Sequence, residues 1–227
     1  MLLHIPAVLD PAELTLCTQL LQDASWADGR ITAGTQSAQV KNNQQLAVDN
    51  PAAATLGNLV LNALSKNAQF FTAALPKRIH PPLFNRYHGI NNAFGNHVDN
   101  AIRASTDNAQ YIRTDLSFTL FLSELDSYDG GELIIEDGYT GRAIKLPAGD
   151  LILYPSSSIH RVAPVTRGTR LACFSWLESM IRAPEHRDLL FNLDMSILTL
   201  RHQHGDNEAT LRLTNCYHNL MRMWADV

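Results

Sequence analysis

The amino-acid sequence predicts an α+β protein with a mainly β core and with helices before and after that core. From about Pro82 to Trp176 the chain carries short runs of strand-forming residues, separated by turns that contain Gly or Pro. The regions on either side repeat apolar residues at helical spacing. Short strands at close, regular intervals without intervening helices predict a sandwich or jelly roll, that is, a double-stranded β-helix.

Two helices are predicted before the core. Asp10, Pro11 and Glu13 supply the N-cap, the first-turn proline and the capping box of a helix that ends near residue 23. Asn50 and Pro51 begin a second helix by the same signals, and we expect it to end at residues 75–76. The second helix has one broad apolar face, formed by Leu56, Leu59, Val60, Ala63, Leu64 and Phe71. The segment between the two helices is predicted to be irregular or to form short strands.

The core strands are expected where β-branched and aromatic residues gather between turn signals. Gly89 and Gly95 indicate a loop ahead of His97. The predicted strands cover residues 83–87, 116–122, 132–135, 151–154, 158–162 and 170–176. We therefore divide the chain into an N-terminal helical support segment packed on the core (1–77), the jelly-roll core (78–180) and a C-terminal helical extension (181–227).

The C-terminal extension is predicted to contain two helices after Pro184, joined by a linker over residues 201–207. The apolar positions that mark the two helices are Leu189, Leu190, Leu193 and Ile197, followed by Leu211, Tyr217, Leu220, Met221 and Trp224. We expect the apolar face of the last helix to pack on the core, and homodimerisation is the alternative role.

Length and composition suit one substantial domain. The chain has 227 residues, of which 45% are hydrophobic and 18% charged, so it can bury a core. Its net charge is −4 and it has no basic tract, so nucleic acid is not an expected partner. No apolar segment approaches the roughly 18 residues that a membrane span needs.

The cysteines and the first residues predict a reducing, cytoplasmic location. Cys17, Cys173 and Cys216 are odd in number and lie far apart, which argues against a disulfide framework and against a zinc knuckle. Residues 1–6 lack the basic region and the long apolar run of a signal peptide.

Three His-x-Asp pairs are candidates for a metal site: His97/Asp99, His186/Asp188 and His204/Asp206. On a strand, residues two apart share a face and can chelate one ion, but on a helix they point roughly 200° apart. The predicted helix after Pro184 therefore excludes the second pair. The third pair lies in a polar linker, where His202, His204 and His218 form a rival set, although a solvated loop is the simpler interpretation.

The pair His97/Asp99 lies at the edge of the strand-rich region, where a later strand brings a third imidazole, His160. Two His and one Asp make the facial triad of non-haem Fe(II) oxygenases. The alternative for His160 is a core histidine that hydrogen-bonds to a backbone carbonyl. Arg170 opens an apolar strand whose inward positions, by alternation, are Arg170, Ala172, Phe174 and Trp176.

An inward guanidinium requires an anionic partner, because an unpaired buried charge is costly. A small dicarboxylate ligand would supply that partner, held by both edges of the planar fork of Arg170. An internal salt bridge, for example to Glu132, is the alternative.

These residues carry a resemblance to a known family. The order His-x-Asp, about sixty residues, His, and ten more residues to Arg resembles the Fe(II)/2-oxoglutarate-dependent dioxygenases of the prolyl/lysyl hydroxylase type, and more narrowly the bacterial PKHD-type hydroxylases. The likeness spans most of the chain. The matching stretches are residues 26–30, 32–34, 40–43, 84–87, 97–101, 115–117, 128–133, 146–150, 154–158 and 165–170.

The resemblance implies roles for five residues. His97, Asp99 and His160 would be the iron ligands, and Arg170 would bind the distal carboxylate of 2-oxoglutarate. Tyr87, ten residues before His97, matches a tyrosine that in related prolyl hydroxylases touches the co-substrate or the metal-facing ligand; a buried strand tyrosine is the ordinary interpretation.

Two positions depart from the family pattern. Phe121 stands where some prolyl hydroxylases carry a co-substrate-binding tyrosine, so that hydrogen bond is missing or replaced. Glu178 stands where close relatives would be expected to have Gln.

The function that the resemblance implies is a hydroxylase that uses Fe(II), 2-oxoglutarate and O2, with ascorbate as the family-type reductant. It would couple oxidative decarboxylation of 2-oxoglutarate to hydroxylation of a C–H bond of an unknown substrate, either a peptide side chain or a small molecule such as a siderophore. Two alternatives stay open: a cupin-like metal-dependent enzyme that does not use 2-oxoglutarate, and a non-catalytic jelly-roll binding or sensor module.

Overall fold

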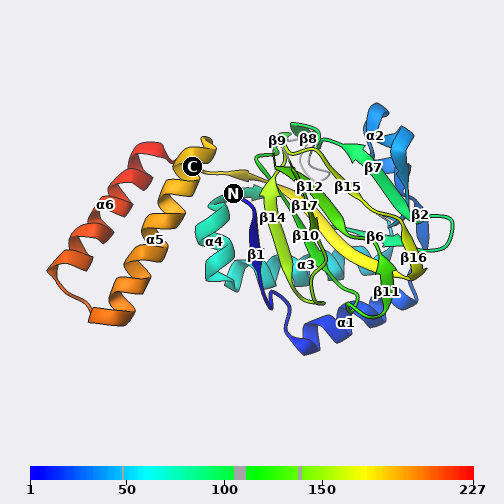
Figure 1. Ribbon diagram of the computed structural model, residues 1–227, viewed down its shortest axis with the longest axis horizontal. Coiled ribbons are helices and arrows are strands. Elements are labelled where there is room, and N and C mark those ends of the chain that lie inside the picture. The colour runs from blue at the N-terminus through cyan, green and yellow to red at the C-terminus, as the bar shows by residue number, and fades with distance from the viewer. Residues whose placement is uncertain (48, 105–110, 138–139) are drawn as a thin grey trace.

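Two antiparallel sheets form the core of the computed structural model, which describes residues 1–47, 49–104, 111–137 and 140–227 (Figure 1). Within the described residues the larger sheet has eight strands. In spatial order they are β1 (Leu3–Ile5), β14 (Leu151–Pro155), β10 (Leu116–Phe121), β17 (Arg170–Ser179), β6 (Leu83–Tyr87), β4 (Gln44–Leu46) and β2 (Trp26–Asp28), while β5 (Pro76–Ile79) also pairs with β17.

The smaller sheet provides the opposite wall of the core. Its strands, in spatial order, are β13 (Thr140–Ile144), β12 (Leu133–Asp137), β15 (His160–Val162), β7 (Ala93–His97) and β3 (Lys41–Asn42). Two short ribbons complete the described strands: β11 (Tyr128–Gly130) with β16 (Val165–Gly168), and β8 (Ile102–Ala104) with β9 (Tyr111–Arg113). Two facing antiparallel sheets make a mixed α/β fold of the jelly-roll kind, as the sequence predicts.

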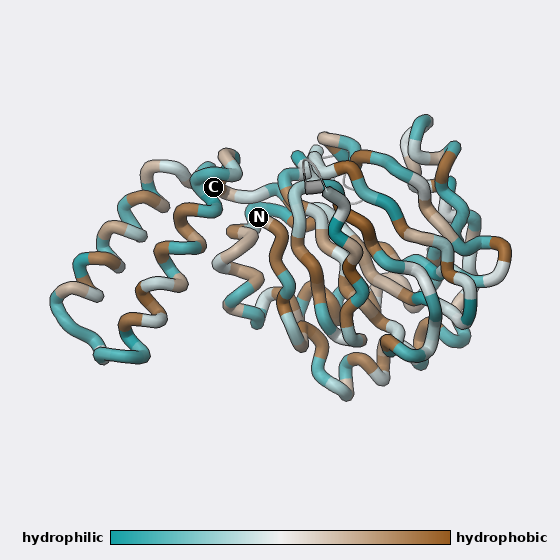
Figure 2. The backbone as a smooth tube through the Cα atoms, in the orientation of Figure 1, coloured by the Kyte–Doolittle hydropathy of each residue, from teal (hydrophilic) through white to brown (hydrophobic). Residues whose placement is uncertain are grey.

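The hydrophobic core has two layers, one on each face of the larger sheet. An inner cluster between the sheets contains Tyr87, Phe121, Tyr128, Leu133, Ile135, Ile152, Tyr154, Val162 and Val165. An outer cluster packs the other face against helices, and includes Leu56, Val60 and Leu64 together with Phe84, Phe118 and Cys173. Figure 2 shows the resulting concentration of hydrophobic residues along the core strands. Because both faces of β10 and β17 are covered, these strands are buried almost throughout.

Three helices cover the outer face of the larger sheet. They are α1 (Pro11–Gln22), α3 (Pro51–Lys66) and α4 (Ala68–Ala74). The capping box of α1 forms as predicted, because the Asp10 carboxylate accepts from the Glu13 amide at 2.8 Å and the Glu13 carboxylate accepts from the Asp10 amide at 3.0 Å. Asn50 caps α3 in the same way, accepting from the Ala52 amide at 2.9 Å.

The single helix predicted for residues 50–76 is wrong in one respect, because Asn67 divides it into two. The Asn67 side chain accepts from the Phe70 amide at 2.9 Å and so starts a new helix. This break changes which residue faces the core: Phe70 is buried, while Phe71, which was expected on the core face, is 49% exposed. A periodicity counted across a helix break assigns the wrong face after it.

Two segments outside the long helices also differ in part from expectation. The region between α1 and α3 contains the short strands β2, β3 and β4, in agreement with the expected irregular structure or short strands. It also contains a 3-10 turn, η1 (Gly29–Thr32), and a short helix, α2 (Thr35–Val40), which the sequence did not predict. The loop expected between Gly89 and Gly95 is short, because residues 93–97 already form β7. Gly95 lies inside that strand since the Val40 side chain would stand 2.9 Å from a Cβ atom there.

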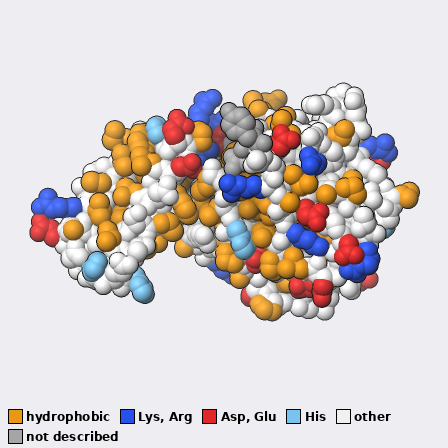
Figure 3. Space-filling view, viewed as in Figure 1, with side chains coloured by type: hydrophobic (Ala, Val, Ile, Leu, Met, Phe, Trp, Pro, Cys, Tyr) orange, Lys and Arg blue, Asp and Glu red, His pale blue; other side chains and the backbone are white. Residues whose placement is uncertain are grey.

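A helical hairpin, α5 (Pro184–His204) and α6 (Glu208–Trp224), extends from the core on the side of α4 (Figure 1). Met180, Tyr217, Leu220, Met221 and Trp224 pack with Leu75, Ile181 and Leu190 at its base. Figure 3 shows further hydrophobic side chains on the visible face of the hairpin, and Leu198, Leu211 and Met223 are exposed. In the described part of the chain, no helix combines the length and the apolar character that crossing a membrane requires.

The linker expected over residues 201–207 is shorter than predicted, because α5 continues to His204. Gly205, with φ of 70°, ends α5, and Asn207 caps α6 by accepting from the Ala209 amide at 2.9 Å. The Arg201 side chain forms an ion pair with Asp206 at 2.9 Å. Polar residues at the end of a long helix do not by themselves mark a loop.

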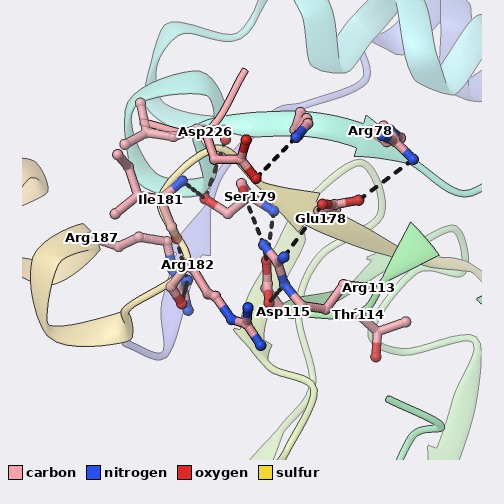
Figure 4. Close-up of polar contacts among 12 residues, drawn as sticks. Arg78, Arg113, Thr114, Asp115, Glu178, Ser179, Ile181, Arg182, Arg187 and Asp226 are labelled. Atoms are coloured by element: carbon pink, nitrogen blue, oxygen red, sulfur yellow. Dashed lines mark hydrogen bonds and ion pairs between the residues drawn. The ribbon is translucent and has the colours of Figure 1, made fainter. Parts of the chain in front are cut away.

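A buried polar network ties the base of the hairpin to the end of β17 (Figure 4). Arg113 binds Asp115 through two hydrogen bonds of 2.8 and 2.9 Å and forms an ion pair with Glu178 at 3.4 Å. Arg187 of α5 donates to the carbonyl oxygen of Ile181 at 2.7 Å. The Glu178 carboxylate therefore pairs with arginine, and it is not among the residues that line the cavity described below.

Candidate metal centre

His97 and His160 lie opposite each other on adjacent strands of the smaller sheet. They are register partners between β7 and β15, and their ring centroids lie 4.2 Å apart. Asp99 follows β7 by two residues and brings its carboxylate to the same point, 3.8 Å from His160 Nε2. One ligand atom from each of the three residues lies within 4.8 Å of the others. The structure thus brings together the three residues that the sequence predicted as metal ligands.

Both imidazoles are oriented by a hydrogen bond to their own backbone. His97 Nδ1 lies 2.9 Å from the Gly95 carbonyl oxygen, and His160 Nδ1 lies 3.0 Å from the Ser158 carbonyl oxygen. A carbonyl only accepts, so each Nδ1 carries the proton and each Nε2 has a free lone pair. Metal-binding histidines are commonly oriented in this way.

The Asp99 carboxylate is held by a chain of two hydroxyl groups from the larger sheet. Ser117 of β10 donates to Asp99 Oδ2 at 2.7 Å, and its hydroxyl also lies 2.7 Å from the Ser156 hydroxyl. Ser117 and Ser156 are both buried. The sequence analysis assigned neither serine a role, although strand alternation in β10 places Ser117 on the inner face.

Aromatic rings surround the imidazoles and keep them in a low-dielectric environment. Phe94 stacks on His97 with 3.6 Å between ring centroids, and Tyr154 meets His160 edge-on at 5.2 Å. Burial, and to a lesser extent the neighbouring His160, lowers the pKa of His97 well below its ordinary value. A neutral imidazole is the form that binds a metal ion.

Arg170 lines the same cavity as a fully buried cation. Its side chain is 1% exposed, and Nε, Nη1 and Nη2 have no hydrogen-bond partner among the described residues. The rings of Tyr87 and Phe121 lie 5.3 and 5.2 Å from the guanidinium carbon. The alternative of an internal salt bridge to Glu132 is wrong, because the ion pairs of the described residues do not include Arg170. An unpaired buried guanidinium of this kind fits a ligand that brings its own anion.

Two neighbours shape the position of Arg170. Tyr87 is its register partner on β6 and is also buried; burial raises the pKa of the Tyr87 phenol, so the group stays protonated and can donate. Gly131 has φ of 69°, and a Cβ there would stand 3.0 Å from Arg170 Cδ. Glycine at this position therefore gives the arginine stem the space it occupies.

The other His-x-Asp pairs do not form a metal site. His186 and Asp188 lie on α5, where His186 stacks on Trp224 with 4.0 Å between centroids. His202 and His204 lie in the last turn of the same helix and His218 lies on α6. Among the described residues, the group formed by His97, Asp99 and His160 is the one cluster with metal-binding spacing.

The cavity also contains residues to which the sequence analysis gave no role. Lys41, Asn43, Asn85, Phe94, Arg103 and Tyr154 line it together with the three ligands, Arg170, and Phe174 and Trp176, which strand alternation had placed on the inward face. Lys41 is 6% exposed, and burial, followed by the nearby Arg103, lowers its pKa to about 8. These side chains come from separate strands without a shared spacing, so no sequence pattern joins them before the chain is folded.

Comparison with known proteins places the chain in a family. Residues 185–226 match the model of the PKHD-type hydroxylase C-terminal domain. A PKHD-type hydroxylase of Polaromonas sp. is 55% identical over 226 residues, and the match covers all of both chains.

Solved structures share the fold at lower identity. A Trichoplax adhaerens prolyl hydroxylase in complex with a hypoxia-inducible-factor peptide fragment has a TM-score of 0.57 and 17% identity, covering 83% of this chain and 86% of its own. A 2OG-Fe(II) oxygenase family oxidoreductase of Burkholderia pseudomallei has a TM-score of 0.52 and 19% identity, covering 77% of this chain and 82% of its own. With 55% identity over its whole length to a named member, the chain belongs to the PKHD-type hydroxylase family.

Proposed function

We propose that this hydroxylase depends on Fe(II) and 2-oxoglutarate, and that it couples oxidative decarboxylation of 2-oxoglutarate to hydroxylation of a substrate C–H bond. The observation that carries the proposal is the unpaired guanidinium of Arg170 in the same buried cavity as His97, Asp99 and His160. A dicarboxylate that chelates a metal ion at one end and meets an arginine fork at the other would satisfy both groups.

The three ligand residues would hold the iron through the atoms that the backbone leaves free. His97 and His160 would bind through Nε2, since each Nδ1–H already donates to a carbonyl group, and Asp99 would bind through its carboxylate. A set of two histidines and one carboxylate leaves further coordination positions open, which suits a co-substrate and O2. Bound iron would supply the oxygen chemistry that no amino-acid side chain provides.

The rest of the cavity would orient the co-substrate and exclude water. The planar fork of Arg170 would bind the distal carboxylate through two parallel hydrogen bonds. Tyr87 would donate its phenolic proton to a co-substrate oxygen, since burial keeps that phenol protonated. Leu133 and Val162, which line the same cavity, would keep solvent away from the reacting atoms.

Several parts of the proposal extend the family assignment. Ascorbate would serve as the reductant that keeps the iron divalent. The three free cysteines are compatible with a reducing cytoplasm, and the net charge of −4 favours a peptide or small-molecule substrate over nucleic acid.

Hydrophobic residues exposed on the hairpin, such as Leu198 and Leu211, support homodimerisation as a further proposal.

The test is anaerobic addition of Fe(II) and 2-oxoglutarate to the full chain. We expect a weak visible charge-transfer band, which the variant His97→Ala removes by taking away a ligand. The variant Arg170→Met should retain Fe(II) binding and lose most of its 2-oxoglutarate affinity. Arg167→Met is the matched control, because Arg167 is exposed and pairs with Asp129 at 2.7 Å.

The same experiment separates this proposal from a cupin-like enzyme or a sensor module. Wild-type protein that binds neither Fe(II) nor 2-oxoglutarate contradicts the proposal. An Arg170→Met variant with unchanged 2-oxoglutarate affinity would favour a metal-dependent enzyme of another kind. Tight binding of both without succinate formation, over a broad set of candidate substrates, would favour a sensor.

A further inference from the structure

Two cations besides Arg170 line the cavity, and neither has an anionic partner among the described residues. Lys41 lies on β3 and is 6% exposed, while Arg103 lies on β8 with its guanidinium carbon 3.7 Å from the centroid of the Trp176 ring. Lys41 Nζ donates to two neutral oxygens, Thr32 Oγ1 at 3.1 Å and Gln45 Oε1 at 3.3 Å. In the described part of the chain, the ion pairs include neither Lys41 nor Arg103.

The charges of the loaded site do not neutralise these cations. Among the described residues that line the cavity, Asp99 carries the one carboxylate. In the loaded site, the iron dication and Arg170 are balanced by Asp99 and by the two carboxylates of 2-oxoglutarate. Lys41, which is buried, and Arg103, which is partly buried, therefore keep two positive charges, and an unpaired buried charge is costly unless an anion joins it.

Lys41 and Arg103 both keep free N–H donors that can bind a carboxylate. An ammonium group has three N–H donors, and Thr32 and Gln45 engage two of those of Lys41, so one is free. Arg103 Nη2 donates to the Thr32 carbonyl at 3.3 Å, and its Nε has no partner among the described residues. The free N–H of Lys41 and the free Nε–H of Arg103 can each donate to one oxygen of a planar carboxylate.

Asn43 gives a second, independent indication of a ligand. It is 2% exposed and lines the cavity; among the described residues neither amide atom has a hydrogen bond of ordinary distance and angle, and the Tyr87 hydroxyl is the nearby polar group. Gly29 makes room for it, because a Cβ at that glycine would stand 1.8 Å from Asn43 Oδ1. A side-chain amide with both a free donor and a free acceptor is complementary to an amide group of a ligand.

These groups connect directly to the metal ligands and to a way out of the cavity. The Phe94 ring stacks on His97 at 3.6 Å, and Lys41 Nζ lies 5.3 Å from the centroid of the same ring. Thr32 and Arg103 also line a neighbouring groove beside α3, next to Gly57. A substrate anchored at Lys41 and Arg103 would thus place one part near the metal and another part in the groove.

We propose that Lys41 and Arg103 bind a carboxylate of the primary substrate, and that Asn43 binds an amide group next to it. The substrate class is then an acylated amino acid, either free or as the carboxyl-terminal residue of a peptide. This inference rests on the proposed function, because it assigns 2-oxoglutarate to Arg170 and the second carboxylate to a different molecule.

The experiment uses the full chain with Zn(II), which is redox-inert, and saturating 2-oxoglutarate, so that the Arg170 end is filled. Binding of 2-oxoglutarate is measured first by calorimetry; failure at that step contradicts the proposed function, and the hippurate titration is then run on the metal-free chain. The probes are hippurate, which has a carboxylate, an amide and a ring, and its primary amide. We expect hippurate to bind at least about tenfold more tightly than the amide, the ratio expected for one charge-assisted hydrogen bond.

The variants Lys41→Met and Arg103→Met should each weaken hippurate binding about tenfold and leave 2-oxoglutarate affinity within about twofold. The retained 2-oxoglutarate affinity shows that the site is folded, and Lys41→Gln provides a second, polar replacement. Lys66→Met and Arg212→Met are the matched controls, since both positions are exposed on helices. These controls should leave hippurate affinity unchanged.

Three outcomes would overturn the inference: equal binding of hippurate and its amide, unchanged hippurate affinity in both cavity variants, or tighter binding of phenyl phosphate than of hippurate. An N-acetylated pentapeptide with a free carboxyl end distinguishes the two candidate substrates, a peptide terminus and a free acylated amino acid. Tighter binding of the pentapeptide supports a peptide terminus, and tighter binding of hippurate supports a free acylated amino acid.

Discussion

His97 of β7 and His160 of β15 are cross-strand partners, with 4.2 Å between the centroids of their rings. Adjacent antiparallel strands place opposed side chains on one face, so a single pairing event brings together two ligands that lie far apart in the sequence. Asp99 completes the group from the segment just after β7. The metal site therefore depends on the register of the smaller sheet, because a slip of β7 by one residue against β15 would turn His97 to the face opposite His160.

Removing the hydroxyl that holds Asp99 should weaken metal binding without unfolding the protein. Ser117→Ala deletes the 2.7 Å hydrogen bond to Asp99 Oδ2. Loss of such a supporting contact lowers metal affinity by about 10- to 100-fold. Metal titration of the variant measures this change, with Ser196→Ala on the exposed side of α5 as the control. Wild-type affinity in Ser117→Ala would show that the serine does not orient the ligand.

Replacing Arg170 should not destabilise the ligand-free protein, despite its complete burial. Arg170 has no hydrogen-bond partner among the described residues, so Arg170→Met removes an uncompensated charge and keeps most of the side-chain volume. We expect an unchanged or higher Tm in the absence of ligand. Saturating 2-oxoglutarate with metal should raise the Tm of the wild type and not that of the variant. A clear drop in the ligand-free Tm would contradict the view that the guanidinium is unpaired.

Gly131 should control co-substrate affinity without touching the co-substrate. Gly131→Ala places a methyl group 3.0 Å from Arg170 Cδ and 2.9 Å from Val165 Cγ2, on a backbone with φ of 69°. We expect a loss of stability of about 1 kcal/mol from the backbone strain, and a higher KM for 2-oxoglutarate as Arg170 shifts. Gly89→Ala is the control, because Gly89 also has positive φ but has open space around it. Equal KM values for 2-oxoglutarate in the two variants would show that the contact of residue 131 with Arg170 does not affect co-substrate binding.

The hairpin should be needed for the stability of the core. Ending the chain at residue 183 would expose Leu75 and Ile181, which pack at its base. Each newly exposed large side chain costs about 1.5–3 kcal/mol, so we expect a markedly lower Tm. Sedimentation of the shortened and full chains tests dimerisation in the same samples. If truncation changes neither the Tm nor the association state, the hairpin has neither role.

The three cysteines should react at very different rates with a thiol reagent. Burial, followed by the nearby Glu13, raises the pKa of Cys17 to about 11, and burial raises that of Cys173 well above its ordinary value. At neutral pH both therefore stay protonated and inaccessible, whereas Cys216 is exposed. Ellman's reagent should titrate one thiol in the native protein and three in denaturant. Rapid labelling of two or more native thiols would contradict this burial pattern.

The sequence by itself determined the fold class, the starts of α1 and α3 and the three residues of the candidate metal cluster. Capping signals at Asp10 and Asn50 are local, and strand alternation through Arg170 and Trp176 depends only on the pleat, so both could be predicted without neighbours. His97 and Asp99 were separated from His186 and Asp188 because a helix cannot bring residues two apart to one ion. The pair His204 and Asp206 was set aside because it was expected to lie in a solvated linker. The helix face at Phe71 was predicted wrongly because the local hydrogen bond of Asn67 restarts the helix.

Only the tertiary structure decided which groups surround that cluster. Ser117 reaches Asp99 because the two sheets face each other, and Lys41 and Arg103 meet at Thr32 because three separate segments converge there. No spacing in the sequence links these residues, since their contacts depend on sheet packing and not on the period of one element. The pairing state of Arg170 has the same origin: the sequence predicts that the guanidinium is buried, but only the packed structure shows that no described side chain satisfies it.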